Sequence, residues 1–141
     1  LLTDVITNLA DATGSSVVVH CCGRRPPVAL FRRAGAAVSL DATALGSVTG
    51  AFADELGEAW QEGAELFLGL VPASGGDEPV RALAQPGLDL VARLGFPRRV
   101  LVESAVVTPT CGLAGVSPVA ARSAIRRVRE VAELFREELD R

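Results

Sequence analysis

Leu-Phe-Leu-Gly-Leu-Val, residues 66–71, is the stretch of this sequence that decides the fold. The run is apolar throughout, it follows a helical pattern that stops at Gly63, and it ends at Pro72 and a Ser-Gly-Gly loop. A short apolar run between turn signals is typical of a strand in a parallel sheet that is covered by helices. We therefore predict a β-strand over 66–71, with an α-helix before it and another after it.

Three further short runs repeat this arrangement along the chain. They are predicted to be strands at 16–19, 37–40 and 105–108. Apolar side chains at helical spacing predict helices near 2–13, 26–31, 52–60, 78–94 and 118–139. The fourth of these helices is expected to kink or break at Pro86-Gly87. Residues 98–103 fit either a turn of helix or an early strand.

The alternation of strands with amphipathic helices predicts an α/β fold in which residues 1–141 form a single domain, an N-terminal helix and four βα units. Two architectures fit this pattern. One is a doubly wound sheet, and the other is part of a (β/α)₈ barrel, of which four units make half. Both architectures place function at the C-terminal ends of the strands, so the residues that follow the strands are the first candidates for a site.

Composition argues against several classes of function. A net charge of −3 at pH 7 disfavours general affinity for nucleic acid or for an anionic membrane. No apolar run approaches the roughly 20 residues that cross a bilayer, and the first residues lack the basic start of a signal peptide. Three cysteines, two of them adjacent, argue against a disulfide framework and favour a reduced, cytoplasmic location.

Residues that can bind a metal follow the first and the last predicted strands. His20 and Cys22 are two residues apart, so in extended backbone their side chains point the same way, whereas Cys21 points to the opposite face. Cys111 follows the last strand in a loop bounded by Pro and Gly. One His and two Cys make a three-ligand zinc set with an open fourth position, which is the arrangement of catalytic zinc.

Two interpretations of these residues stay open. Taken alone, His20 and the adjacent cysteines also fit a small buried Cys pair beside a core histidine. Asp41, at the end of the second strand, is either an additional oxygen ligand of the metal or a helix cap or solvated loop carboxylate.

A longer match concerns the last of these loops. Val-Thr-Pro-Thr-Cys-Gly-Leu-Ala-Gly, residues 107–115, resembles the C-terminal cysteine motif of the cobalamin-independent methionine synthase catalytic domain. His-Cys-Cys-Gly at 20–23 and Val-Ser-Leu-Asp at 38–41 resemble that family's H-x-C pair and its downstream acidic strand end. The resemblance covers essentially the whole chain, matched to the C-terminal half of the barrel. It extends to the superfamily of uroporphyrinogen decarboxylases and corrinoid-dependent methyltransferases.

The resemblance implies a (β/α)₈ TIM-type barrel and a methyltransferase of methionine biosynthesis. It implies that the methyl group passes from 5-methyltetrahydrofolate to the thiol of homocysteine. It also implies zinc as the cofactor, with His20, Cys22 and Cys111 as ligands and Asp41 at the place of the acidic ligand. A free thiol has a pKa of about 8.5, and zinc deprotonates it at neutral pH without oxidising it.

Three other interpretations are kept beside this one. Methionine synthases usually carry Glu where this chain has Asp41, and an Asp looks more like the corrinoid-dependent thiol methyltransferases. A metal-free lyase that resembles the decarboxylases would leave His20 and the cysteines without a role. A non-catalytic fragment of such a barrel would only inherit the motif.

The chain begins without Met and directly in a helical pattern, so we expect it to be a piece of a longer barrel protein and to be inactive by itself. Half a barrel leaves apolar strand edges and helix faces open. This predicts a homodimer formed through those surfaces, or a compact flavodoxin-like rearrangement.

Overall fold

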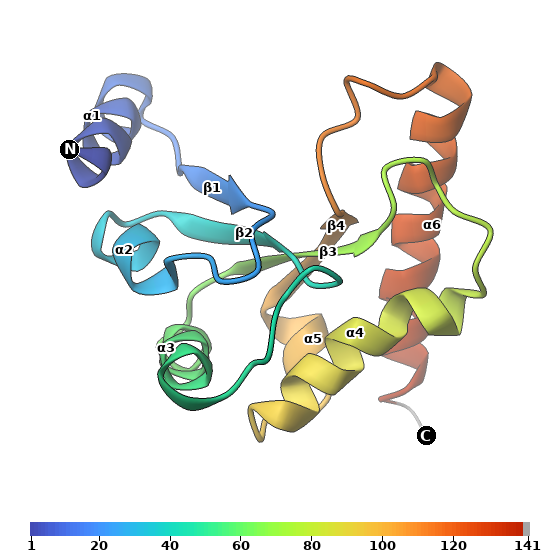
Figure 1. Ribbon diagram of the computed structural model, residues 1–141. Coiled ribbons are helices and arrows are strands. Elements are labelled where there is room, and N and C mark those ends of the chain that lie inside the picture. Colours follow the sequence, from blue (N-terminus) through green and yellow to red (C-terminus); the bar gives the residue numbers. More distant parts are fainter. Residues whose placement is uncertain (140–141) are drawn as a thin grey trace.

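The computed structural model describes residues 1–139 and consists of four strands and six helices within that range (Figure 1). In chain order these are α1 (Leu2–Thr13), β1 (Val18–Cys21), α2 (Val28–Arg33), β2 (Ala37–Asp41), α3 (Gly50–Gln61), β3 (Leu66–Val71), α4 (Val80–Arg93), α5 (Val100–Glu103), β4 (Ala105–Pro109) and α6 (Pro118–Glu137). The predicted α/β class and the order of its strands and helices are confirmed. None of the described helices is long and apolar enough to span a membrane.

All four strands are parallel, and their order in the sheet is their order in the chain, β1-β2-β3-β4. Doubly wound sheets contain a point at which the strand order reverses, and this sheet contains none. Because crossovers between parallel strands are right-handed and here all step in one direction, the connecting helices fall on one face of the sheet. Figure 1 shows α2, α3 and α4 together below the strands. The topology is compatible with half of a (β/α)₈ barrel.

The covered face of the sheet carries the core. Val38 and Leu40 on β2, and Leu66 and Leu68 on β3, are fully buried there against the helices. The residues that alternate with them, such as Ser39 and Phe67, point to the other face and are only partly buried, and Val18 on β1 remains 44% exposed. Sequence analysis predicted a sheet covered by helices, and the structure covers one face only.

The helix that was expected to kink or break at Pro86-Gly87 does not break. α4 is one continuous helix with Pro86 inside it, although proline cannot donate the usual backbone hydrogen bond. A Cβ atom at Gly87 would lie 3.1 Å from Phe135 Cζ and 3.3 Å from a Leu70 methyl carbon. The missing side chain therefore lets α4 approach both β3 and α6 closely at this point, and these contacts hold the helix together.

Smaller differences concern the ends of the elements. β1 begins and ends two residues later than predicted, so His20 and Cys21 belong to the strand itself. The ambiguous segment 98–103 contains the short helix α5. At the start of α6, Ser117 caps the helix, because its Oγ accepts a hydrogen bond from Ala120 N at 3.2 Å. The first helix ends at Gly14, whose φ of 61° is left-handed.

Candidate functional site

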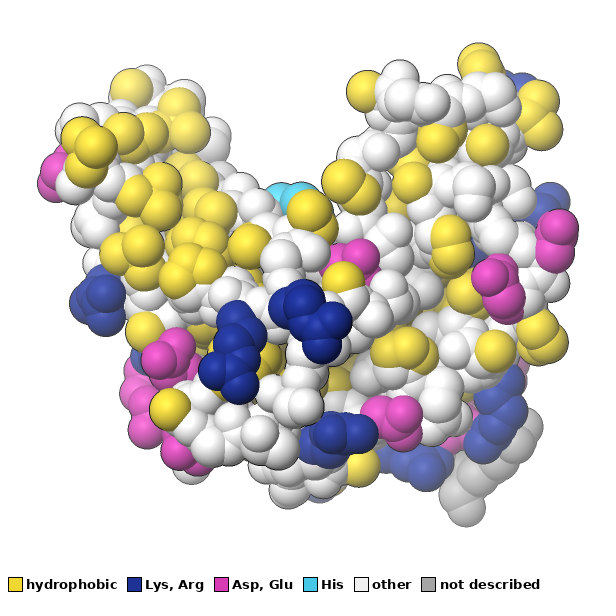
Figure 2. Space-filling view, in the orientation of Figure 1, with side chains coloured by type: hydrophobic (Ala, Val, Ile, Leu, Met, Phe, Trp, Pro, Cys, Tyr) yellow, Lys and Arg dark blue, Asp and Glu magenta, His cyan; other side chains and the backbone are white. Residues whose placement is uncertain are grey.

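The uncovered face of the sheet forms the floor of a hollow. In Figure 2 the only histidine of the chain, His20, lies at the bottom of a notch in the molecular outline. The orientation shared with Figure 1 shows what borders the notch: α1 and β1 on one side, the loop after β4 and the start of α6 on the other. The C-terminal ends of the strands open into this hollow, which is where function is expected in parallel α/β folds.

Side chains on this face lie in rows because the strands are in parallel register. Neighbouring strands pair His20 with Ser39, Ser39 with Phe67, and Phe67 with Val106, which makes one row across the sheet. The next row towards the strand ends pairs Asp41 with Gly69 and Gly69 with Thr108. Polar groups are thus concentrated on β1 and β2 in the first row, and at the C-terminal edge in the second.

His20 and Ser39 form the one side-chain hydrogen bond of the first row. His20 Nδ1 lies 2.9 Å from Ser39 Oγ, and the imidazole is exposed to the hollow. Val38 and Leu40, which flank Ser39 in β2, are fully buried on the opposite face. The Ser39 hydroxyl therefore lies on a strand whose position is fixed by the buried side chains before and after it. Its hydrogen bond restrains the His20 ring at Nδ1.

The two adjacent cysteines point to different faces, as the alternation of side chains along a strand predicts. Cys21 is partly buried and packs against the hydrophobic core, together with Val19 on the same face of β1. Cys22 is exposed. The interpretation of both cysteines and His20 as one buried structural group is therefore wrong, because only Cys21 contacts the core.

Cys111 lies beyond the opposite edge of the sheet, two residues after β4 ends at Pro109, and its thiol is free and exposed. The backbone just before it is anchored, because Thr110 N donates to Val71 O at 2.8 Å. The chain passes so close to β3 here that a Cβ atom at Gly69 would lie 2.8 Å from Thr110 Cα. Because Gly69 has no side chain, the loop that carries Cys111 can leave the sheet directly beside β3.

Asp41 holds the turn that follows β2. Its Oδ1 accepts hydrogen bonds from Thr43 N at 2.9 Å, from Thr43 Oγ1 at 2.6 Å and from Ala44 N at 3.2 Å. This is the local bonding by which an Asp side chain stabilises a turn. No helix begins here, since α3 starts at Gly50 with Thr49 at its N-cap, so Asp41 is not a helix cap. A metal-ligating role for Asp41 would have to use its other carboxylate oxygen.

The four predicted ligands, His20, Cys22, Cys111 and Asp41, share one edge of the sheet without forming a cluster. Within residues 1–139, no three His, Cys, Asp or Glu side chains come close enough together to hold one metal ion. β1 and β4 are separated by two strands, which corresponds to about 14 Å at the usual strand spacing. The donor types suit zinc, with one imidazole and two free thiols, but the distance between the edge strands keeps the set apart.

Sequence analysis assigned no role to two hydroxyl side chains at this edge. Ser39 alternates with the fully buried Val38 and Leu40, and this single polar residue in an apolar strand was the available signal. Thr108 Oγ1 is buried and has no hydrogen-bond partner in the described part of the chain. Thr108 follows two valines in β4, and nothing in the sequence indicates that its hydroxyl is left unpaired.

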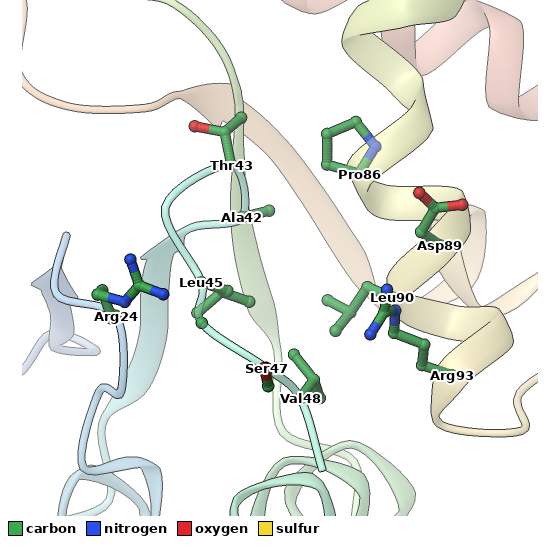
Figure 3. A pocket seen from close by; sticks show the side chains of 11 residues that line it. Arg24, Ala42, Thr43, Leu45, Ser47, Val48, Pro86, Asp89, Leu90 and Arg93 are labelled. Atoms are coloured by element: carbon green, nitrogen blue, oxygen red, sulfur yellow. The ribbon is translucent and has the colours of Figure 1, made fainter.

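A separate pocket of about 440 Å³ lies between the segment that follows β2 and helix α4. Figure 3 shows Arg24 on one side of the segment that carries Leu45, and Arg93 with Asp89 across the pocket on α4. Neither arginine forms an ion pair with any residue that the structure describes, whereas Asp89 Oδ1 accepts from Gln85 Nε2 at 2.8 Å. None of the four predicted ligands lines this pocket, so it is distinct from the hollow.

Comparison with known proteins adds no family. No protein-family model matches the chain, and neither a curated protein nor a solved structure matches it.

Proposed function

We propose that this chain is the C-terminal half of a (β/α)₈ methyltransferase of the cobalamin-independent methionine synthase type. The proposed reaction transfers a methyl group from 5-methyltetrahydrofolate to the thiol of homocysteine. The chain contributes the zinc ligands, and another half barrel completes the substrate pocket. By itself the chain is expected to be inactive.

One observation carries this proposal: the thiol and imidazole groups all lie at the C-terminal edge of a sequentially ordered parallel sheet. His20 lies near the end of β1, Cys22 directly follows this strand, and Cys111 follows β4. The side of the sheet that would form the barrel interior is open, and His20 is exposed on it. The sequence motifs around these residues resemble those of the methionine synthases, which specifies the reaction within the barrel enzymes.

The proposed ligands are His20 Nε2, Cys22 Sγ and Cys111 Sγ, with Asp41 Oδ2 as the additional oxygen ligand, because Asp41 Oδ1 is engaged in the turn. When bound, zinc would stabilise the substrate thiol as a thiolate that can accept a methyl group. His20 is oriented for this role by its hydrogen bond to Ser39. Asp41 Oδ1 instead fixes the turn after β2, which borders the site.

Closure of the barrel is the step that the proposal adds to the observed fold. An eight-stranded ring needs four more parallel strands, and both β1 and β4 present a free edge to receive them. In the purified chain we propose that a second copy takes this place and forms a homodimer. Closure curves the sheet, and curvature tilts the loops after β1 and β4 towards the barrel axis.

A purely structural or binding role is the second candidate, and the separation of the thiols on the two edge strands favours it. The first candidate predicts that the chain binds zinc, whereas a structural or binding role requires no metal. A metal-free lyase would also leave the cysteines without a function.

Zinc analysis of the purified chain tests the proposal. After incubation with excess zinc and gel filtration, we expect about one zinc ion per chain by elemental analysis, as in single-site zinc enzymes. Cys111→Ser is expected to abolish zinc retention. Cys21→Ser is the matched control, because the Cys21 thiol faces the core, and it is expected to keep the metal. Failure of the wild-type chain to retain zinc would contradict the zinc proposal.

The methyl donor is settled by an assay with homocysteine and the longer barrel protein. Formation of methionine from 5-methyltetrahydrofolate supports the proposed reaction. Turnover with a methylated corrinoid alone would assign the chain to the corrinoid-dependent branch instead.

A further inference from the structure

The pocket between the segment after β2 and helix α4 has an arginine on each of two opposite sides. Arg24 comes from the loop after β1, and Arg93 comes from the last turn of α4. Figure 3 shows the two guanidinium groups directed towards each other across the pocket, with Leu45 between them. Within residues 1–139, neither group forms an ion pair or a side-chain hydrogen bond. The N–H donors of both arginines are therefore available to a ligand.

The segment after β2 holds Arg24 beside the pocket. Gly46 N donates a hydrogen bond to Arg24 O at 3.0 Å, which ties the two loops together. A Cβ atom at Gly46 would lie 3.5 Å from Arg24 Nε and 3.7 Å from its Nη2, so the guanidinium lies along this segment. Part of the side-chain freedom of Arg24 is thus lost before a ligand binds, which lowers the entropic cost of binding.

The opposite wall combines Arg93 with a carboxylate one helical turn earlier. Asp89 Oδ1 accepts a hydrogen bond from Gln85 Nε2 at 2.8 Å, and Asp89 makes no ion pair with Arg93. Asp89 is the only carboxylate that lines the pocket. Two arginines and one aspartate leave one net positive charge here, although the net charge of the chain is −3.

The space between the two arginines is lined mainly by apolar side chains. Val48 and Leu90 are 8% and 3% exposed, and Leu45 and Pro86 complete this part of the wall. A ligand that contacts both arginines must therefore carry an acidic group at each end and a hydrocarbon segment between them. A carboxylate matches the single charge and the planar fork of a guanidinium group.

We propose that this pocket binds a small organic dicarboxylate, with one carboxylate on Arg24, the other on Arg93, and the hydrocarbon segment against Leu45 and Leu90. Its volume of about 440 Å³ is in the range of small-molecule pockets. Every residue that lines it belongs to this chain, and none is a proposed zinc ligand. The site therefore depends neither on metal binding nor on closure of the barrel.

Titration of the ¹⁵N-labelled chain with simple carboxylates, followed by NMR, tests the proposal. The probes are succinate, glutarate and adipate, with propionate as the monocarboxylate reference and inorganic phosphate as a second anion. Ionic strength is kept constant because salt screens exposed charges. We expect at least one dicarboxylate to bind about fivefold more tightly than propionate, the gain from a second exposed ion pair. The shifted backbone amides should lie in 42–48 and 86–93.

Charge-removing variants identify the residues that hold the two carboxylates. Arg24→Gln and Arg93→Gln are each expected to weaken binding of that dicarboxylate about fivefold, to the level of propionate. Arg122→Gln is the matched control, because Arg122 is exposed on α6 and does not line the pocket. Asp89→Asn keeps an oxygen for Gln85 but removes the repulsion, so it should bind the dicarboxylate more tightly than the wild type. All four positions are exposed, and the same NMR spectra report whether each variant is folded.

Several outcomes would overturn the proposal. Propionate or phosphate binding as tightly as every dicarboxylate would exclude a two-ended ligand. Shifts outside the two segments, or an equal loss of affinity in Arg122→Gln, would indicate general charge attraction. An unchanged or lower affinity in Asp89→Asn would exclude a carboxylate beside Arg93. None of these results involves zinc, so failure of this proposal leaves the proposed methyltransferase function untouched, and the reverse holds as well.

Discussion

Gly69 is the residue at which the sheet and the loop that carries Cys111 come closest. A Cβ atom here would lie 2.8 Å from Thr110 Cα, 2.9 Å from Leu40 O and 3.1 Å from Pro109 O. All three are backbone atoms, so none can move without shifting a strand or the loop. We expect Gly69→Ala to lower the free energy of unfolding by about 1–3 kcal/mol, the usual cost of overpacking. Denaturant unfolding followed by the fluorescence of the buried Trp60 measures this change.

Gly115→Ala is the matched control for this substitution. Nothing lies within 4 Å of a Cβ atom at Gly115, and its φ is not among the left-handed values of the chain. We expect a change of less than about 0.5 kcal/mol, as for other surface substitutions. Equal stabilities of the two variants would contradict the prediction, because they would mean that the loop near Gly69 can move to accommodate a Cβ atom at no cost in stability.

Single residues differ in how much the sequence predicts about them. Alternation along β1 is a local property, and it correctly separated His20 and Cys22 from Cys21. The partner of His20 is not local, because Ser39 meets it only through the register of two strands. The turn that Asp41 stabilises is local again, but sequence analysis considered only a metal ligand, a helix cap or a solvated loop carboxylate at this position.

At the scale of elements, helix ends were more predictable than helix continuity. Ser117 and the following proline mark the start of α6, and Gly14 marks the end of α1. α4 passes through Pro86 without interruption because contacts with Leu70 and Phe135, both far away in the sequence, compensate for a local defect. Local rules predict the defect but not the compensation.

The caps of α6 and α3 provide a matched pair for an element-scale prediction. Ser117 Oγ accepts a hydrogen bond from Ala120 N, whereas Thr49 holds the corresponding position of α3 without such a bond. We expect Ser117→Ala to lower the free energy of unfolding by about 1 kcal/mol, the typical value of an N-cap. Thr49→Ala is expected to cost clearly less, and urea unfolding of both variants measures the difference. An equal or larger loss in Thr49→Ala would show that the cap bond of Ser117 does not stabilise α6.

At the scale of the whole molecule, the sequence predicts the repeated βα unit but not the order of the strands in the sheet. Four βα units fit both a doubly wound sheet and a barrel segment. The local sequence does not indicate at which edge of the sheet each successive strand is added. The order β1-β2-β3-β4 decides between them in favour of a sheet without reversal. It also explains why Ser39 and Thr108 occur in strands that otherwise look like core: both belong to the face without helices.

The uncovered surfaces of the molecule predict self-association of the purified chain. β1 and β4 are free edges, and α1 exposes an apolar stripe in which Leu2, Val5 and Leu9 are 43%, 57% and 51% exposed. A two-fold axis along the axis of the barrel would place β4 of each copy beside β1 of the other, with α1 over the new junction, and would close a ring of eight parallel strands. We therefore expect light scattering after gel filtration to give twice the mass of one chain at tens of micromolar.

Val5→Asp and Thr7→Asp distinguish dissociation caused by a charge inside the proposed interface from a general effect of added charge. Val5 belongs to the apolar stripe of α1, and Thr7 lies on the opposite side of the same helix and is also exposed. Burial of the new carboxylate at Val5 without a partner is costly, so Val5→Asp should shift the chain to monomer. Thr7→Asp should remain dimeric, because its carboxylate stays in water. A monomeric wild-type chain would contradict the proposed dimer. Equal dissociation by both substitutions would contradict an interface that includes α1, because in this interface the side of α1 with Leu2, Val5 and Leu9 faces the second copy and the side with Thr7 does not.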